Sequence, residues 1–241
     1  MCVIFISIGQ IPEYPLLLLA NRDEYYERPT EKAEFWEDFP SIFAGRDLVS
    51  KGTWLGVSKT GRIAAVTNYR DPNQKKGTRS RGDLVADFLK AEIPAEEYLK
   101  SVQADSGDYT GFNLIVGEIN PERQELFYYS NIEEKIRSLA EGLYGLSNNL
   151  LDVPWPKVKK GKKRLTHLIT NAEIEKEKFF EILSDTELAD DNDLPDTGIG
   201  FDREKLLSAI FIETPIYGSR CSTVLMVDES FEFDFEERVF V

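Results

Sequence analysis

Cys2 is the residue whose type and position suggest the most specific chemistry. Removal of Met1 would leave a thiol and a free α-amine on the same residue, and cysteine is small enough to allow that removal. An unperturbed α-amine has a pKa of about 7.7–8.0, so it can accept the proton of its own thiol without a histidine. The competing interpretation is a small apolar residue at the start of a buried strand, and residue 2 taken alone favours it.

The chain has one histidine, His167, so any Ser-His or Cys-His mechanism and any zinc site would have to use it. His167 follows a basic run, 157–164, in a segment with helical spacing of apolar residues, which predicts a surface histidine. The run could attract a phosphate or an anionic membrane, although a solvated helix face is the favoured interpretation. Cys221, like Cys2, is predicted to be a free thiol. We therefore expect no metal site and a catalytic base other than imidazole.

Three groups of polar residues follow predicted strands and favour the catalytic interpretation of Cys2 over the structural one. They are Asn21-Arg22-Asp23-Glu24, Asn68 and Asn148-Asn149. Asparagine amides at strand ends can donate to a developing oxyanion, and an Arg-Asp pair can hold an N-terminal amine and a substrate carbonyl. The alternative is that each asparagine caps a turn.

Composition limits the class of protein. The 241 residues are 41% hydrophobic and 30% charged, which fits one domain over residues 1–241. With 43 Asp and Glu against 29 Lys and Arg, the net charge is −14, so nucleic acid is not an expected partner. The longest apolar run, 16–20, is too short to span a bilayer, and residues 1–15 lack the features of a secretory signal. We expect a cytoplasmic protein.

The predicted elements alternate between groups of strands and groups of helices. Short apolar, β-rich segments predict strands over 3–8, 16–21, 54–58, 63–67, 112–119, 125–130, 144–147, 223–228 and 231–235. Helices are predicted after the N-cap Ser80, from Pro94 to about Val102, around His167, and over 173–183 and 203–210. The charged stretch up to Pro40 is predicted to be a loop. Hairpin-length turns between neighbouring strands indicate an α+β fold with two antiparallel sheets packed face to face and helices outside.

Several motifs resemble those of one known family. They are Met1-Cys2, 20–24 (ANRDE), 52–56 (GTWLG), 67–69 (TNY), 111–115 (GFNLI), 144–148 (YGLSN) and 217–220 (YGSR). In this order they are similar to the NRDE family, which includes the transport and Golgi organisation protein 2 homologues. The resemblance extends from residue 1 to about residue 238.

The resemblance implies a fold and a set of site residues. The family resembles the N-terminal nucleophile (Ntn) hydrolases, whose fold is a four-layer αββα sandwich and whose cysteine branch includes penicillin V acylase and bile salt hydrolase. By this likeness Cys2 matches the nucleophile, Asp23 the acid that orients the amine, Asn68 and Asn148 the oxyanion and amine contacts, and Arg220 the late active-site arginine. We assign Asn21, Arg22, Trp54 and Tyr69, which lie in the shared motifs, to substrate binding. One departure is that the hydrolases place an arginine where this chain has Ala20, whereas Arg22 directly precedes Asp23.

Two functions follow as hypotheses. The first is an Ntn-type amidase or acyltransferase for a small, partly apolar amide or thioester, with Cys2 as nucleophile. The alternative is a non-catalytic binding or carrier protein of the same fold, for haem or for acyl-CoA and lipids, as proposed for homologues. No bound cofactor is expected, but haem is a possible cargo, with His167, Met226, a tyrosine or a cysteine as axial ligand. Asp23 and Arg220 could equally form a buried structural ion pair.

Overall fold

The computed structural model describes residues 3–241, and their contacts divide into two compact units. Unit 1 contains the residues up to Glu27, Arg70–Pro72 and Glu141–Val241. Unit 2 contains Arg28–Tyr69 and Asn73–Ala140. The prediction of a single domain over residues 1–241 stays a prediction.

Unit 1 is built on a five-stranded antiparallel sheet with the order β10-β1-β2-β11-β12. Its strands are β1 (Val3–Ile11), β2 (Tyr14–Tyr25), β10 (Gly142–Leu146), β11 (Tyr217–Val227) and β12 (Phe233–Val239). The predicted N-terminal hairpin is present, and Val3 lies opposite Asn21 in its register. The long central strand β2 thereby carries the 20–24 motif between β1 and β11.

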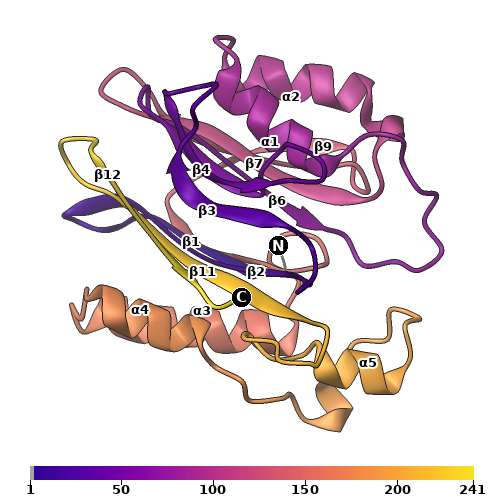
Figure 1. Cartoon of the computed structure of the whole chain (residues 1–241). Helices are drawn as coiled ribbons and strands as arrows, with labels where there is room; N and C mark the ends of the chain where they lie inside the picture. Colours follow the sequence, from indigo (N-terminus) through magenta and orange to yellow (C-terminus); the bar gives the residue numbers. More distant parts are fainter. Residues whose placement is uncertain (1–2) are drawn as a thin grey trace. The chain divides into compact units, whose positions relative to one another are not determined.

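The helices α3 (Pro156–Thr170) and α4 (Lys176–Leu183) cover one face of this sheet (Figure 1). Pro156 occupies the first turn of α3, where the missing amide hydrogen costs no helical hydrogen bond. Side chains of α3 and α4 pack with those of β1 and β2 in one buried cluster, which includes Phe5, Leu19 and Phe179. A short helix, α5 (Phe201–Leu206), and a 3-10 turn at Asp191–Asp193 lie in the connection to β11.

Unit 2 is built on a seven-stranded antiparallel sheet in which the strands follow one another in chain order. They are β3 (Thr30–Phe35), β4 (Ile42–Asp47), β5 (Leu55–Ser58), β6 (Arg62–Asn68), β7 (Phe112–Ile119), β8 (Gln124–Ser130) and β9 (Lys135–Leu139). The turn between β5 and β6 uses Gly61 at a φ of 80°, as expected for the residue that closes this hairpin.

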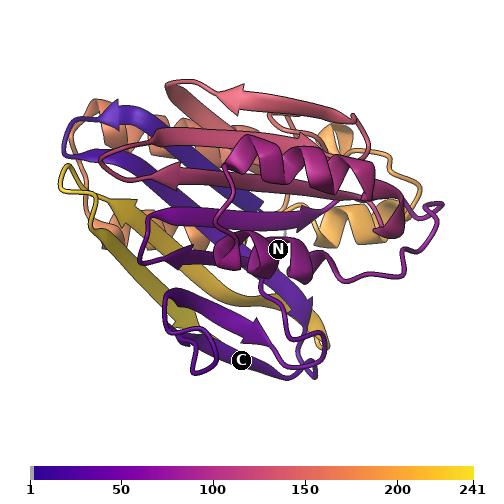
Figure 2. The same ribbon diagram turned by 90° about the horizontal axis from the view of Figure 1, so that it is seen from above.

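The helices α1 (Arg81–Lys90) and α2 (Ala95–Ala104) pack on one face of this second sheet and are followed by a 3-10 turn at Ser106–Asp108. Figure 2 shows the two helices lying over its strands. Ser80 is the N-cap of α1 and accepts a hydrogen bond from the Gly82 amide, as predicted.

The structure confirms the predicted α+β class with two antiparallel sheets, and it corrects several elements. The stretch expected to be a loop contains β3, and two further strands, β4 and β9, were not predicted. The last helix ends at Leu206 and does not extend to residue 210. No helix within residues 3–241 is long and apolar enough to cross a membrane.

Candidate functional site

Asp23 is buried near the end of β2, with 3% of its surface exposed. Its Oδ1 accepts a hydrogen bond of 2.5 Å from the hydroxyl of Ser219 on β11. Its Oδ2 has no hydrogen-bond partner among residues 3–241, although buried carboxylate oxygens in proteins are nearly always paired. A donor from outside the described residues would therefore be stabilised at Oδ2. Cys2, the predicted nucleophile, lies outside the described residues.

Asn21 uses its whole side chain to join β2 to other parts of unit 1. Its Nδ2 donates to the carbonyl oxygens of Leu183, at 2.8 Å, and Ile210, at 2.9 Å. Its Oδ1 accepts a hydrogen bond of 2.6 Å from Ser222 on β11. The geometry favours a structural role, and the assignment of Asn21 to substrate binding stays a prediction.

Arg22 is buried and lies opposite Cys221 in the register of β2 and β11. Burial raises the pKa of the Cys221 thiol well above its usual range, and the charge of Glu237 and a hydrogen bond with it act in the same direction. The positive charge of Arg22 opposes this shift only in part. Cys221 therefore stays protonated near neutral pH and is not a thiolate nucleophile, so Cys2 is the remaining candidate.

Arg220 follows Ser219 on β11 at an irregularity in the pairing with β2. Its guanidinium donates to the carbonyl oxygens of Tyr25, at 3.2 Å, and Val241, at 3.1 Å. Its own carbonyl oxygen accepts from the amide of Phe240. These contacts hold the end of β2 and the residues after β12 to β11, and the role of Arg220 as an active-site arginine stays a prediction.

Asn148 follows β10 and is fixed by Arg70. The main-chain amide of Arg70 donates to the Asn148 carbonyl oxygen at 2.8 Å, and its Nη2 donates to Oδ1 at 3.3 Å. Nη1 of the same guanidinium bonds to Glu204 Oε2 of α5 at 2.6 Å. Sequence reasoning missed Arg70 and Glu204, which are 134 residues apart, because nothing in the local pattern pairs them.

The remaining predicted residues, Asn68, Tyr69 and Trp54, belong to unit 2. Asn68 ends β6 opposite Phe112. The next residue, Tyr69, donates its main-chain amide to the carbonyl oxygen of Gly111 at 3.0 Å. Trp54 is buried, and its ring covers β4 so closely that a Cβ at Gly45 would lie 2.4 Å from it. The roles assigned to these three residues stay predictions.

A buried polar network lies beside Asn68 and was not predicted. Nδ2 of Asn113 on β7 donates to the Thr67 hydroxyl at 3.0 Å, and its Oδ1 accepts from the Tyr128 hydroxyl at 2.7 Å. Asn113 lies in the 111–115 motif, which was the only signal in the sequence for this network.

Comparison with known proteins places the chain. The family model described as Transport and Golgi organisation 2 matches residues 1–241. The chain belongs to this family. A Transport and Golgi organization protein 2 homolog from Bos taurus is 36% identical over 255 residues, which cover 99% of this chain and 92% of the relative.

Two solved structures with a fold similar to this family member are named as hydrolases. The Caenorhabditis elegans ortholog of N-acylethanolamine-hydrolyzing acid amidase has a TM-score of 0.53 at 9% identity and covers 93% of this chain and 92% of its own. The C2A mutant of the conjugated bile acid hydrolase from Clostridium perfringens has a TM-score of 0.52 at 9% identity and covers 100% and 97%. These likenesses confirm the predicted Ntn-hydrolase-like fold.

Three basic residues of the run 157–164 in this family member are paired with acidic residues. Lys160 and Arg164 both bond to Asp185, at 2.7 and 2.9 Å, and Lys162 bonds to Asp152 at 2.6 Å. Burial acts to raise the pKa of Asp185, but the hydrogen bonds from Lys160 and the Glu187 amide and the charges of both α3 partners outweigh it, so this pKa is lowered. Lys157 differs from the predicted solvated face because it is buried. His167 is exposed, as predicted.

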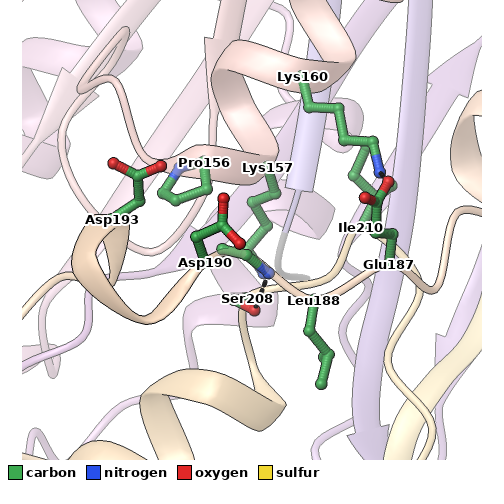
Figure 3. A pocket seen from close by; sticks show the side chains of 10 residues that line it. Pro156, Lys157, Lys160, Glu187, Leu188, Asp190, Asp193, Ser208 and Ile210 are labelled. Atoms are coloured by element: carbon green, nitrogen blue, oxygen red, sulfur yellow. Dashed lines mark hydrogen bonds and ion pairs between the residues drawn. The ribbon is translucent and has the colours of Figure 1, made fainter.

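A cavity of about 200 Å³ lies at the start of α3 and contains none of the predicted site residues. Figure 3 shows Lys157 and Lys160 reaching from α3 towards the loop that carries Glu187 and Asp190. Lys160 bonds to Glu187, and the amide of Ala189 donates to the Ser208 hydroxyl at 2.9 Å. The cavity therefore lies between a helix and a loop that are joined by polar contacts. Residues 3–241 hold no group of His, Cys, Asp and Glu side chains arranged for a metal ion.

A larger groove of about 570 Å³ lies between α3 and α4. Its lining includes the buried side chains of Leu168 and Ile182 and the exposed His167. The rest of the lining is charged, with four basic and two acidic side chains: Lys160, Lys163, Arg164, Lys178, Glu173 and Glu181.

Proposed function

We propose that this protein is an Ntn-type hydrolase or acyltransferase in which Cys2, exposed by removal of Met1, is the nucleophile. The observation that carries the proposal is the buried Oδ2 of Asp23, which has no partner among residues 3–241. The N–H of a neutral α-amine at residue 2 would supply the missing donor, and Asp23 would then orient the amine, with its lone pair free to accept a proton, beside its own thiol. The protonated, buried Cys221 and the exposed His167 support the same choice of nucleophile and base.

The chemistry needs no cofactor. The α-amine takes the thiol proton while sulfur bonds to the substrate carbonyl carbon, whose oxygen becomes an oxyanion. Asn148, which belongs to the same unit as Asp23, donates to that oxyanion, and such a donor is worth about 2.7–4 kcal/mol in other hydrolases. Collapse of the intermediate breaks the bond to the leaving amine or thiol, which takes the proton from the α-ammonium group.

The product of this first half is a thioester on Cys2. Water attacks the thioester carbon and gives a proton to the α-amine, and collapse then returns the thiol and releases a carboxylic acid. An acceptor amine or thiol in place of water would give acyl transfer. Arg220 and Asp23 orient the reacting groups, and Arg22, in the same unit, is the proposed substrate contact.

The proposed substrate is a small, partly apolar amide or thioester. Support comes from the solved relatives, one of which is named for hydrolysing N-acylethanolamines and another as a bile acid hydrolase. We place this activity in the cytoplasm.

The first experiment is the intact mass of the protein purified from its native host, combined with turnover of N-acyl amides and acyl thioesters of graded chain length. We expect a mass without Met1, and turnover that is lost in Cys2→Ala and kept in the matched variant Cys221→Ser. Asp23→Asn should lower kcat because it removes the charge opposite the amine. A protein that retains Met1 has a blocked amine, and that result would reject the self-activated nucleophile.

A carrier function is the second candidate, and the groove between α3 and α4 favours it. Haem is an amphiphilic anion that needs an axial ligand, and His167 lines the groove together with two apolar and four basic side chains. By contrast, Met226 is packed in the core and Cys221 is buried. Haem titration monitored by the Soret band tests this candidate. A carrier should bind haem equally well in Cys2→Ala, and His167→Ala should weaken binding and shift the band.

A further inference from the structure

Arg70 lies at the centre of a buried polar cluster in unit 1. Its side chain is 10% exposed and that of its partner Glu204 is 3% exposed. The guanidinium also stacks on the ring of Trp155, 4.8 Å from the ring centroid. A cation on an aromatic face and a buried carboxylate together leave the guanidinium little freedom to turn.

Glu204 is itself held from the other side. Its Oε1 accepts hydrogen bonds from the amide and the hydroxyl of Thr197, at 2.9 and 2.5 Å, while Oε2 accepts from Arg70. Both carboxylate oxygens are therefore engaged, and the position of Arg70 Nη1 is fixed by α5 and the loop before it. With Nη1 held in this way, Nη2 donates to the Oδ1 of Asn148.

This contact decides which way the Asn148 amide faces. A guanidinium can only donate, so it selects the oxygen end of the amide and turns the Nδ2 end away. The main-chain bond from Arg70 to the Asn148 carbonyl fixes the backbone at the same residue. Arg70 thus acts on both the backbone and the side-chain amide of Asn148.

We propose that Arg70, held by Glu204 and Trp155, is a positioning residue that keeps the Asn148 amide oriented as a hydrogen-bond donor in the active site. The inference rests on the proposed function, in which Asn148 stabilises the oxyanion. Arg70 itself touches neither substrate nor nucleophile in this scheme.

The test compares Arg70→Lys with a matched control, Arg62→Lys. Arg62 is also a buried arginine, with a side chain 7% exposed, paired with Glu118 at 2.8 Å and stacked on Phe88 at 3.9 Å. Lysine keeps the charge in both variants but cannot reach two partners with a planar fork. General loss of packing or charge should therefore affect both variants alike.

Two readouts are made on each variant. The first is the NMR resonance of the Asn148 side-chain amide, identified by its absence in Asn148→Asp. The second is kcat and KM on the substrate found in the chain-length panel. Arg70→Lys should shift the Asn148 resonance and lower kcat by about tenfold or more with KM unchanged, because loss of a whole oxyanion donor costs about 10²–10³ in kcat. Arg62→Lys should do neither.

The outcomes separate this inference from the proposed function. An unmoved Asn148 resonance in Arg70→Lys, or a shifted one with kcat equal to that of the control, overturns the role of Arg70. If the wild-type protein has no Cys2-dependent turnover, the proposed function fails. The resonance then still decides whether Arg70 orients Asn148, and an unmoved signal overturns that orientation.

Discussion

Replacing Asn21 by alanine should destabilise the protein strongly while leaving the turnover of the folded fraction unchanged. The Asn21 side chain is fully buried and makes three hydrogen bonds, with Leu183, Ile210 and Ser222. Alanine leaves two carbonyl oxygens unsatisfied, at about 1–3 kcal/mol each, whereas the Ser222 hydroxyl can rotate to another acceptor. We therefore expect a loss of about 4 kcal/mol, a large share of the roughly 5–15 kcal/mol that stabilises an ordinary domain.

Urea unfolding measures this loss. With an m-value near 3 kcal/mol per molar urea, the midpoint of Asn21→Ala should fall by about 1 M or more. Ser222→Ala removes one of the three bonds and should cost only about 1 kcal/mol. The reasoning is refuted if the free energy of unfolding of Asn21→Ala lies within about 1 kcal/mol of the wild-type value. A normal midpoint with a raised KM would instead mean that Asn21 contacts the substrate.

Three further predictions test the packing and the electrostatics. Gly161→Ala should lower the free energy of unfolding by about 1–3 kcal/mol, because a Cβ at this position would lie 2.0 Å from the Phe5 ring. The control is Gly107→Ala, whose added Cβ would have no atom within 4 Å. Thermal unfolding of both variants measures the difference. Asp185→Asn should cost about 1 kcal/mol at pH 7. The pKa of Asp185 is lower in the folded state than its ordinary value of 3.8, so the ionised carboxylate stabilises the folded protein. This stabilisation is fully present above pH 3.8 and is lost as pH falls through the folded-state pKa. Urea midpoints of wild type and Asp185→Asn should therefore converge below pH 3.8, and a constant gap would contradict the ion pair. The Cys221 thiol in Cys2→Ala should react with iodoacetamide at pH 8 only after unfolding, as read by mass spectrometry, because burial raises its pKa; rapid reaction of the folded protein would contradict that burial.

The sequence predicted the buried strands well and the edge strands poorly. The hairpin of β1 and β2 and that of β5 and β6 combine apolar strands with turn residues, so their local pattern is strong. By contrast, β3 and β9 lie at the two edges of the seven-stranded sheet and carry charged, partly exposed residues. Edge strands of natural proteins use such residues to avoid pairing with other chains, so they resemble loops in the sequence.

The site residues were found by type, but their partners were not. Asp23 and Ser219 are 196 residues apart, and Asn148 meets Arg70 from 78 residues away. Hydrogen bonds over such separations leave no periodic pattern in one sequence, since periodicity reports only which face of an element is buried. Motif resemblance could therefore name Asn148 but not the residue that orients it.

The faces of β2 bear on Ala20, which occupies a position where the resemblance to the hydrolases implies an arginine. Leu17, Leu19 and Asn21 face the helices of unit 1, and successive residues of a strand point to opposite faces. Ala20 and Arg22 therefore share the other face of the sheet, about 6.6–6.8 Å apart along the strand. The resemblance to the hydrolases implies an arginine at the position of Ala20, and Arg22 is the arginine that β2 carries on the same face.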